Sequence, residues 1–319
     1  MQLTHLAIDH IIGLLSGHRE KGDHTPLFIG IQGPQGIGKS TLTSSLVEAL
    51  AVSHQLTAVA LSIDDFYLSH SGLASLAGNN PGNKLLNGRG EPGTHDLPLI
   101  SHVLQGLVRI NDGDAQPVIV PRFDKSLHDG QGDRVPIGST INGPVDIVIF
   151  EGWCMGFHPL PLSTLRQRYL LVSELPSSSS RPEATLEREI VRAHTLQNIE
   201  QINNILRSYR QSLYPFFSGF IQLAPPPSRP YSYIYRWRLQ QEHSMKAQNG
   251  GRGMNDDEVK GFIDRYIPGY IFFSEGVLWG YNPSEGSERD DTSTAPPWIG
   301  HGLRIILSLE REVEEVQHF

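Results

Sequence analysis

Short apolar runs alternate along the chain with longer segments in which apolar residues recur every three or four positions. The runs are continuous and rich in β-branched residues, a pattern typical of strands that are buried on both faces of a parallel sheet. These runs predict strands at residues 26–32, 57–63, 117–121, 145–150 and 168–172. The later runs FIQLA and LRIILSL are candidates to complete the same sheet.

The segments between these runs have the spacing of helices. Leu3, Leu6 and Ile11 begin such a pattern near the N-terminus, and Asp96 is a suitable N-cap for a helix over 97–109. The other predicted helices cover residues 39–51, 183–213, 231–247 and 255–267. This order predicts an α/β fold in which helices flank a mainly parallel sheet, with the last two helices as a C-terminal helical appendage.

Some segments follow neither pattern and are rich in Gly, Pro, Asn or Ser. Residues 64–95 are too long for a plain connection, and long irregular segments in compact domains are usually functional. The segments 176–182, 224–230 and 282–297 are too polar to bury enough apolar surface, so we predict that they are flexible and exposed.

The composition restricts the partners of the protein. The chain has 319 residues, 38% of them hydrophobic, which suffices for a sizeable core. Its 26 Lys and Arg against 34 Asp and Glu give a net charge of -8, so there is no general attraction for nucleic acid or for an anionic membrane. Any bound anion must therefore be held by a local cluster of cations.

The compartment is predicted from what the sequence lacks. The single cysteine, Cys154, excludes an internal disulfide framework and indicates a reducing environment. No apolar run approaches the roughly 20 residues that span a bilayer. The N-terminal segment has neither a signal-peptide nor a transit-peptide pattern. The cytoplasm is the predicted compartment, with the nucleus as a further candidate beside it, and the sequence identifies no protein partner.

The segment GPQGIGKST matches G-x-x-x-x-G-K-[ST] between a predicted strand and a predicted helix, the context that this motif requires. In such a loop Lys39 reaches the β- and γ-phosphates and the Ser40 hydroxyl ligates Mg²⁺. The alternative is a glycine-rich turn with a chance Lys-Ser, but pattern and context agree on ATP or GTP. The residues predicted to bind the nucleotide are Gly33, Gly36, Ile37, Gly38, Lys39, Ser40 and Thr41.

Acidic residues follow two of the predicted strands. Asp64 comes after the second strand and could accept the proton of an acceptor hydroxyl, while Asp65 could bind substrate or support Mg²⁺ and its waters. The alternative is a strand end capped by two aspartates, with Phe66 and Tyr67 in the core. Glu151 ends the run VDIVIF in a Walker-B-like arrangement, which predicts a second ligand for Mg²⁺.

The loop NKLLNGRGEPGTHD, residues 83–96, predicts a site for a small anionic acceptor. Arg89 offers a guanidinium that matches a carboxylate or phosphate bidentately, and His95 is a second candidate to bind substrate. The alternative is an exposed loop in which Asp96 serves only as a helix cap.

A second polar loop, residues 121–134, follows the third predicted strand. In a parallel α/β fold this loop would open toward the γ-phosphate, so Lys125 is a candidate to bind substrate, although a solvated run of charges is the usual explanation. Arg181, Arg188 and Arg192 could close as a lid, but the pattern slightly favours a surface helix with ion pairs.

Several motifs together carry a resemblance to a known family. GPQGIGKST, SIDDFYL, PRFDKS and VIFEGW, in this order, resemble the P-loop small-molecule kinases of the phosphoribulokinase, uridine kinase and pantothenate kinase group. Over nearly the whole chain, NKLLNGRGEPGTHD, FDKSLHDGQGDR, FEGWCMGFHPL, YRWRLQQEH and GMNDDEVKGFIDRYIPGY resemble the D-glycerate 3-kinases and their fungal ATP-dependent kinase-like relatives.

The resemblance implies a transfer of the γ-phosphate of ATP, with Mg²⁺, to a hydroxyl of D-glycerate or a similar small hydroxy acid. By position, Asp64 would be the catalytic base, Glu151 the Walker-B-like acid and Lys39 the phosphate-loop lysine. We expect one P-loop kinase domain over 1–319. It would comprise a nucleotide-binding core over about 26–172, a lid and helical appendage over about 176–280, and a C-terminal strand and helix over about 300–319.

A different class of function also fits the sequence. A nucleotide-binding regulator or scaffold could keep the fold and the phosphate loop without acceptor turnover. A motor or a GTPase switch is disfavoured, because the sequence has no N/T-K-x-D-like motif for selecting the base and no segments typical of ATPase sensors.

Overall fold

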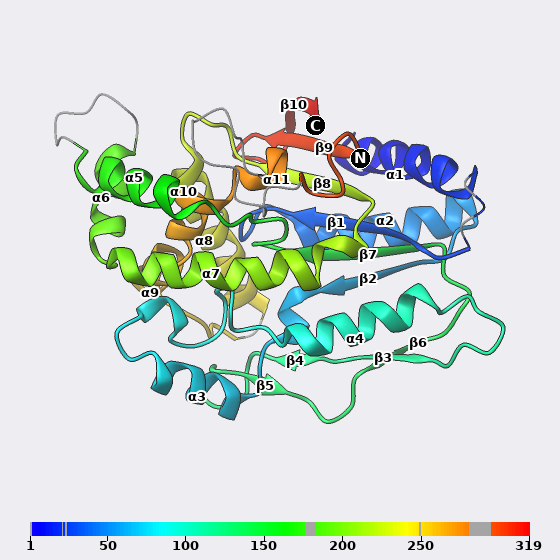
Figure 1. The fold of residues 1–319 in the computed structure, drawn as a ribbon, viewed down its shortest axis with the longest axis horizontal. Coiled ribbons are helices and arrows are strands. Elements are labelled where there is room, and N and C mark those ends of the chain that lie inside the picture. Colours follow the sequence, from blue (N-terminus) through cyan, green and yellow to red (C-terminus); the bar gives the residue numbers. More distant parts are fainter. Residues whose placement is uncertain (1, 21, 23, 176–182, 249, 281–294) are drawn as a thin grey trace.

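A six-stranded sheet forms the centre of the molecule in the computed structural model, which describes residues 2–20, 22, 24–175, 183–248, 250–280 and 295–319. Its strand order is β10-β9-β8-β1-β7-β2, and all neighbours are parallel except β10, which is antiparallel to β9 (Figure 1). The strands of this sheet are β1 Leu27–Gln32, β2 Ala58–Ser62, β7 Ile147–Gly152, β8 Gly219–Ala224, β9 Gly302–Leu307 and β10 Val313–His318.

Helices cover both faces of the sheet because its strands bury both sets of alternating side chains. Ile29 and Ile149 pack with α1 and α2 on one face, whereas Phe28, Val148 and Phe150 face a larger core with α4, α5, α7 and α10. The α-helices are α1 Gln2–Glu20, α2 Lys39–His54, α3 His70–Asn79, α4 Leu97–Val108, α5 Leu162–Ser173, α6 Ala184–Arg192, α7 Leu196–Ser212, α8 Pro230–Gln248, α9 Asp256–Asp264, α10 Ile267–Phe273 and α11 Gly276–Trp279.

Short elements complete the described chain. Two small antiparallel sheets pair β3 with β6 and β4 with β5. The short strands are β3 Val118–Val120, β4 Phe123–Asp124, β5 Asp133–Arg134 and β6 Ser139–Ile141, and the 3₁₀ helices are η1 Ile63–Phe66, η2 Lys84–Leu86 and η3 Tyr214–Phe216. None of the described helices combines the length and the apolar character needed to cross a membrane.

The predicted strands at 26–32, 57–63 and 145–150 are confirmed, as are those at FIQLA and LRIILSL. The run at 117–121 is a strand, but it pairs with β6 outside the central sheet. The prediction of a strand at 168–172 is wrong, because this run lies in α5. Leu170 and Leu171 in this run are 53% and 64% exposed. Leu165 and Val172, two helical turns apart, face the core instead.

The predicted C-terminal helix was also wrong. Residues after β9 turn back through Ser308, whose N–H donates to the carbonyl of Glu312, and continue as β10 along the edge of the sheet. None of the residues of β10 is fully buried, and its charged residues Glu314 and Glu315 are exposed, which suits an edge strand.

The predicted helices are confirmed with shifts at their ends. Asp96 caps α4 by accepting from the N–H of Leu99, and Thr195 begins α7 after a break, so that 183–213 forms two helices. The segment 64–95 is not irregular throughout, because it contains α3. Segment 176–182 with Arg181, and residues 282–294 of the segment 282–297, lie outside the described residues.

Candidate active site

The phosphate loop and the two predicted acids lie at one edge of the central sheet. β7 lies between β1 and β2, and Glu151 of β7 is opposite Ile31 of β1 and Ser62 of β2. The phosphate loop follows β1 directly, and Asp64 follows β2 directly. Since parallel strands end at the same edge, these groups meet where such folds bind their ligands.

The backbone of the phosphate loop has the conformation that its glycines permit. Gly36 and Gly38 have φ values of 78° and 107°, in the left-handed region that favours glycine. α2 starts at Lys39 without a side-chain cap from the described residues, so its first N–H groups are available for an anion. Figure 1 shows that the chain reverses direction between β1 and α2, where the phosphate loop connects them.

Lys39 and Ser40 lie beside Glu151. Lys39 Nζ donates to the Pro34 carbonyl at 3.2 Å, and burial lowers the pKa of this lysine although Glu151 and Asp64 oppose the shift. Ser40 Oγ donates to Glu151 Oε1 at 3.2 Å. A hydroxyl and a carboxylate side by side are the hard oxygen donors that Mg²⁺ prefers.

A complete metal site is not formed by the protein alone. Within the described part of the chain, no group of three or more His, Cys, Asp or Glu side chains could hold an ion. Ser40 and Glu151 therefore fit a metal that arrives with a nucleotide, whose phosphates and waters would supply the other ligands.

Asp64 is an ionised carboxylate held by two neighbours. It accepts from Lys125 Nζ at 2.5 Å and from the Tyr67 hydroxyl at 2.9 Å, and its side chain is 31% exposed. Burial alone would raise the pKa of Asp64, but the charge and hydrogen bond of Lys125, together with smaller effects of His95 and Tyr67, bring it to about 2. Asp65 instead accepts from the Phe123 N–H at 3.2 Å and does not line the cavity described next.

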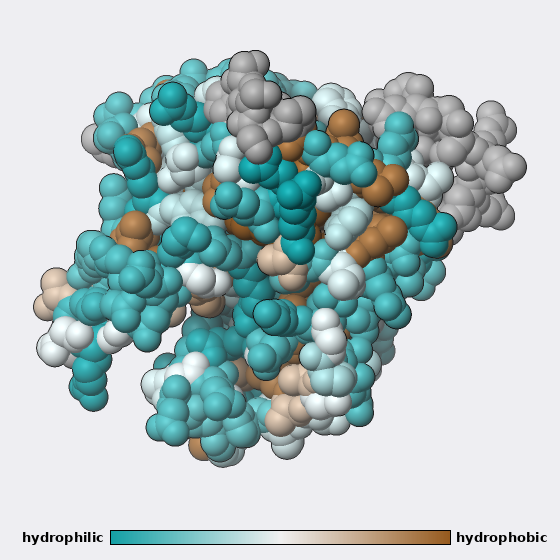
Figure 2. All heavy atoms as spheres, turned by 90° about the vertical axis from the view of Figure 1, so that its left-hand side faces the viewer, coloured by the Kyte–Doolittle hydropathy of each residue, from teal (hydrophilic) through white to brown (hydrophobic). Residues whose placement is uncertain are grey.

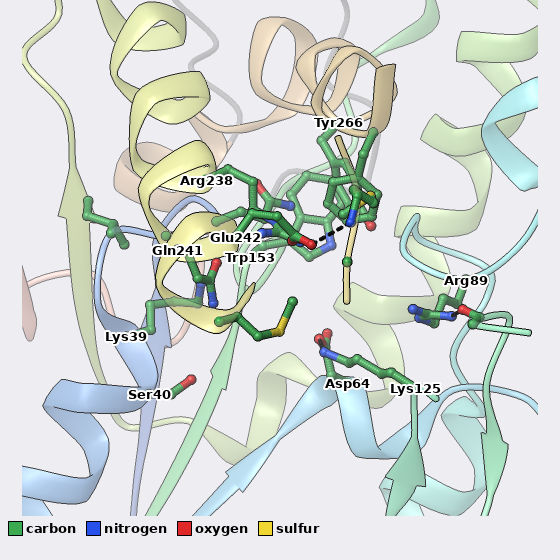
Figure 3. Close-up of a pocket in the computed structure, with 18 of the residues that line it drawn as sticks. Lys39, Ser40, Asp64, Arg89, Lys125, Trp153, Arg238, Gln241, Glu242 and Tyr266 are labelled. Carbon is green, nitrogen blue, oxygen red and sulfur yellow. Dashed lines mark hydrogen bonds and ion pairs between the residues drawn. The ribbon is translucent and has the colours of Figure 1, made fainter. Parts of the chain in front are cut away.

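A cavity of about 2010 Å³ opens at this edge of the sheet. Figure 2, which looks at the left-hand side of Figure 1, shows a hollow whose surroundings are mostly hydrophilic. In Figure 3, Lys39 and Ser40 lie on one side of Asp64 and Arg89 lies on the other. The volume exceeds the roughly 300–1,000 Å³ of a typical ligand pocket, so two substrates can bind side by side.

Arg89 and His95 are placed differently from each other. Arg89 lines the cavity and donates through Nη1 to the carbonyls of Gly130 and Gln131, at 2.6 and 2.5 Å. His95 is buried behind the cavity wall, stacked on Tyr67 at 4.6 Å between ring centroids. Burial lowers the pKa of His95 to about 4, so the ring is neutral near pH 7 and supports Tyr67.

Arg134 of the second polar loop, and Arg188 and Arg192 of the candidate lid, lie outside the cavity. Arg134 pairs with Asp96 at 2.7 Å and donates to the Tyr67 carbonyl, so it supports the loop structure. Arg188 and Arg192 donate to carbonyls at the end of α5, which agrees with a surface helix rather than with a lid over the phosphates.

Three features of the cavity wall were not identified from the sequence. Arg311, in the turn between β9 and β10, donates through Nε to the Gly36 carbonyl at 2.9 Å. Arg238 and the buried Glu242 form an ion pair at 2.7 Å within α8. Arg265 follows α9 directly and also lines the cavity. Conspicuous motifs contained Arg238 and Arg265, but nothing in the sequence placed them beside the phosphate loop.

Comparison with known proteins identifies kinases as relatives, although no family model matches the chain. It is 35% identical over 280 residues to the uncharacterized kinase mug58 of Schizosaccharomyces pombe, covering 86% of this chain and 90% of that protein. It is 34% identical over 279 residues to the chloroplastic D-glycerate 3-kinase of Arabidopsis thaliana, covering 86% of this chain and 53% of that protein, about half its length.

A solved structure agrees with these relatives. The D-glycerate 3-kinase of Cryptococcus neoformans var. grubii superposes on this chain with a TM-score of 0.86 and 37% identity, and the match covers 99% of both chains. The architecture described above, including the appended helices α8 to α10, is therefore shared over the full length of that structure.

Proposed function

The chain belongs to the D-glycerate 3-kinase family of ATP-dependent P-loop kinases, which transfer a phosphoryl group to a hydroxyl, and on this premise we propose that it phosphorylates a small hydroxy acid. D-Glycerate is the first candidate. One observation carries the proposal: Asp64 and the phosphate loop line the same cavity, and Lys125 and Arg89 line it beside Asp64 on the side away from Lys39.

In the proposed reaction, ATP binds with its phosphates on the loop that ends at Lys39. The acceptor hydroxyl forms a bond to the γ-phosphorus while the bond from that phosphorus to the β–γ bridging oxygen breaks, and ADP leaves. Asp64 accepts the hydroxyl proton as the oxygen–phosphorus bond forms, and Lys39 offsets the charge that develops on the phosphates. With its pKa near 2, Asp64 acts chiefly by orienting the hydroxyl and receives the proton late.

Mg²⁺ fits the same proposal. Ser40 and Glu151 would hold it, and when bound it would neutralise charge on the β- and γ-phosphates. The hydrogen bond between Ser40 Oγ and Glu151 Oε1 supports this assignment, because it holds the two oxygens side by side next to the loop.

The test is ADP release from Mg·ATP with a panel of acceptors. We expect stimulation by D-glycerate or another small hydroxy acid and none by nucleosides or sugars, because the acceptor side of the cavity carries cations. ATP binding without stimulation by any acceptor, in a protein shown to be folded, would overturn the proposal and favour a regulatory role.

A further inference from the structure

Arg265 is a cavity-lining cation that pairs with no carboxylate in the described part of the chain. Its Nη1 donates to the Asn87 carbonyl at 2.6 Å, and its Nη2 donates to the Arg89 carbonyl. These two bonds attach the residue after α9 to the loop over residues 87–90. Its Nε is buried and has no hydrogen-bond partner among the described residues.

The loop and the residues after α9 are closely packed at this point. A Cβ added to Gly90 would lie 2.2 Å from the Tyr266 hydroxyl and 2.9 Å from Arg265 Nη2, so both groups rest directly on the glycine backbone. The guanidinium also lies over the Tyr266 ring, 5.6 Å from its centroid. Arg265 is therefore held in one orientation before any substrate binds, which reduces the entropy lost on binding.

The positive charge of Arg265 is not neutralised nearby. Arg265 acts on the buried carboxyl group of Glu91, but burial outweighs this effect and raises the pKa of Glu91 to about 8. Near pH 7 Glu91 is thus mostly uncharged. Arg89 likewise donates to carbonyls, and no ion pair of the described residues includes it. Lys125, by contrast, already pairs with Asp64.

A buried or half-buried guanidinium without a counter-ion favours binding of an anion, and its planar donors match a carboxylate. Tyr266, the next residue, lies across the cavity from Asp64 and Lys125 in Figure 3. We propose that Arg265 binds the carboxylate of the acceptor, so that the hydroxyl of the same molecule is directed to Asp64. This inference rests on the proposed function and names the group that makes the site selective for acids.

The test compares D-glycerate with its neutral amide, D-glyceramide, in wild type and Arg265→Gln. Loss of one charged hydrogen-bonding group is expected to lower the preference in kcat/KM for the acid over the amide by roughly 10- to 100-fold. The KM for ATP should stay within about twofold. Arg265→Lys should recover part of the preference, because it restores the charge without the planar donors.

Lys260→Gln is the matched control, because it removes a positive charge from α9 at a side chain that is 59% exposed and outside the cavity. Thermal unfolding and binding of an ATP analogue verify the fold, and Arg265→Lys serves if Arg265→Gln does not fold. An equal loss of kcat/KM for acid and amide would reduce Arg265 to a support of the loop, and wild-type kcat/KM for both would exclude it from binding; either result overturns this inference but not the proposed function. A wild type that neither binds nor phosphorylates any hydroxy acid overturns the proposed function as well.

Discussion

At the scale of single residues, the state of Asp64 is decided by Lys125. The two side chains form an ion pair at 2.5 Å, and this pair keeps the pKa of Asp64 low despite burial. A carboxylate that stays ionised is always able to accept a hydroxyl hydrogen bond, but it is a weak base. Lys125 thus keeps Asp64 ionised over a wide pH range but makes Asp64 a weaker base.

Replacing Lys125 by Met should raise the pKa of Asp64, because burial would then act without the opposing ammonium. The acid limb of kcat/KM, which reports the free enzyme, should move to higher pH, so that the variant loses more activity than wild type as pH falls. A pH–rate profile of both proteins measures this. An acid limb at the same pH in both would show that Lys125 does not set the charge of Asp64.

Glu91 gives a prediction on stability. Its pKa is near 4.5 in an unfolded chain and about 8 in the folded protein, because burial favours the protonated form. A raised folded pKa means that the stabilising effect is complete below about 4.5 and is lost as pH rises through about 8. The free energy of unfolding of wild type should therefore fall relative to Glu91→Gln across this range, as measured by urea unfolding. A difference in free energy of unfolding between the two proteins that stays constant across this pH range would contradict the raised pKa of Glu91.

At the scale of elements, α8 lies directly against the phosphate loop. Gly36 has no room for a side chain, because an added Cβ would lie 2.6 Å from the carbonyl oxygen of Trp237. The Trp237 side chain is fully buried and donates to the Leu309 carbonyl, which joins α8 to the turn between β9 and β10. The shape of the loop thus depends on two elements that follow it by about 200 residues or more.

Gly36→Ala should destabilise the protein by about 2 kcal/mol or more and weaken ATP binding, since the new methyl group must displace α8 and φ is positive. Gly78→Ala is the matched control, because Gly78 lies in α3 with nothing within 4 Å of an added Cβ. That change should be neutral or slightly stabilising. Denaturant unfolding and nucleotide titration compare the variants, and equal behaviour would show that α8 is not fixed against the loop.

The sequence predicted those elements whose burial follows from their own pattern. The strands β1 and β7 are buried at every position, and apart from Gln32 and Glu151 they carry no polar side chain, which suits strands with helices on both faces. RYLLV is also a short run rich in apolar residues, but it became part of α5, in which Leu165 and Val172 pack against the core. Local pattern does not contain that information.

The same distinction between local sequence pattern and tertiary packing applies to the site. Lys39, Asp64 and Glu151 lie together as predicted, because parallel strands end at one edge of the sheet. Arg265 and Arg311 reach the cavity through contacts between segments more than 170 residues apart in sequence. Charged residues after a helix or in a hairpin turn are common, and only the tertiary fold reveals which of them face a ligand.

At the scale of the whole molecule, one cavity joins the sheet edge, the polar loops and the helices after β8. Figure 3 shows its phosphate-loop side and its Arg89 side separated by Asp64. The appended helices α8 and α9 therefore form the wall that faces the strand ends, with Arg238 and Arg265 in it. In the proposed reaction, a nucleotide on the phosphate-loop side and an acceptor on the Arg89 side would meet beside this carboxylate, which would bring the acceptor hydroxyl close to the γ-phosphate.

The most direct test of this account is transfer of the γ-phosphate of ATP to D-glycerate in a single turnover by wild type and Asp64→Asn. We predict that wild type forms phosphoglycerate and that the variant is slower by roughly 10²- to 10⁴-fold, while both bind ATP with similar affinity. Transfer by Asp64→Asn at the wild-type rate would contradict the central role of Asp64. Absence of phosphoglycerate with the folded wild type would contradict the proposed acceptor.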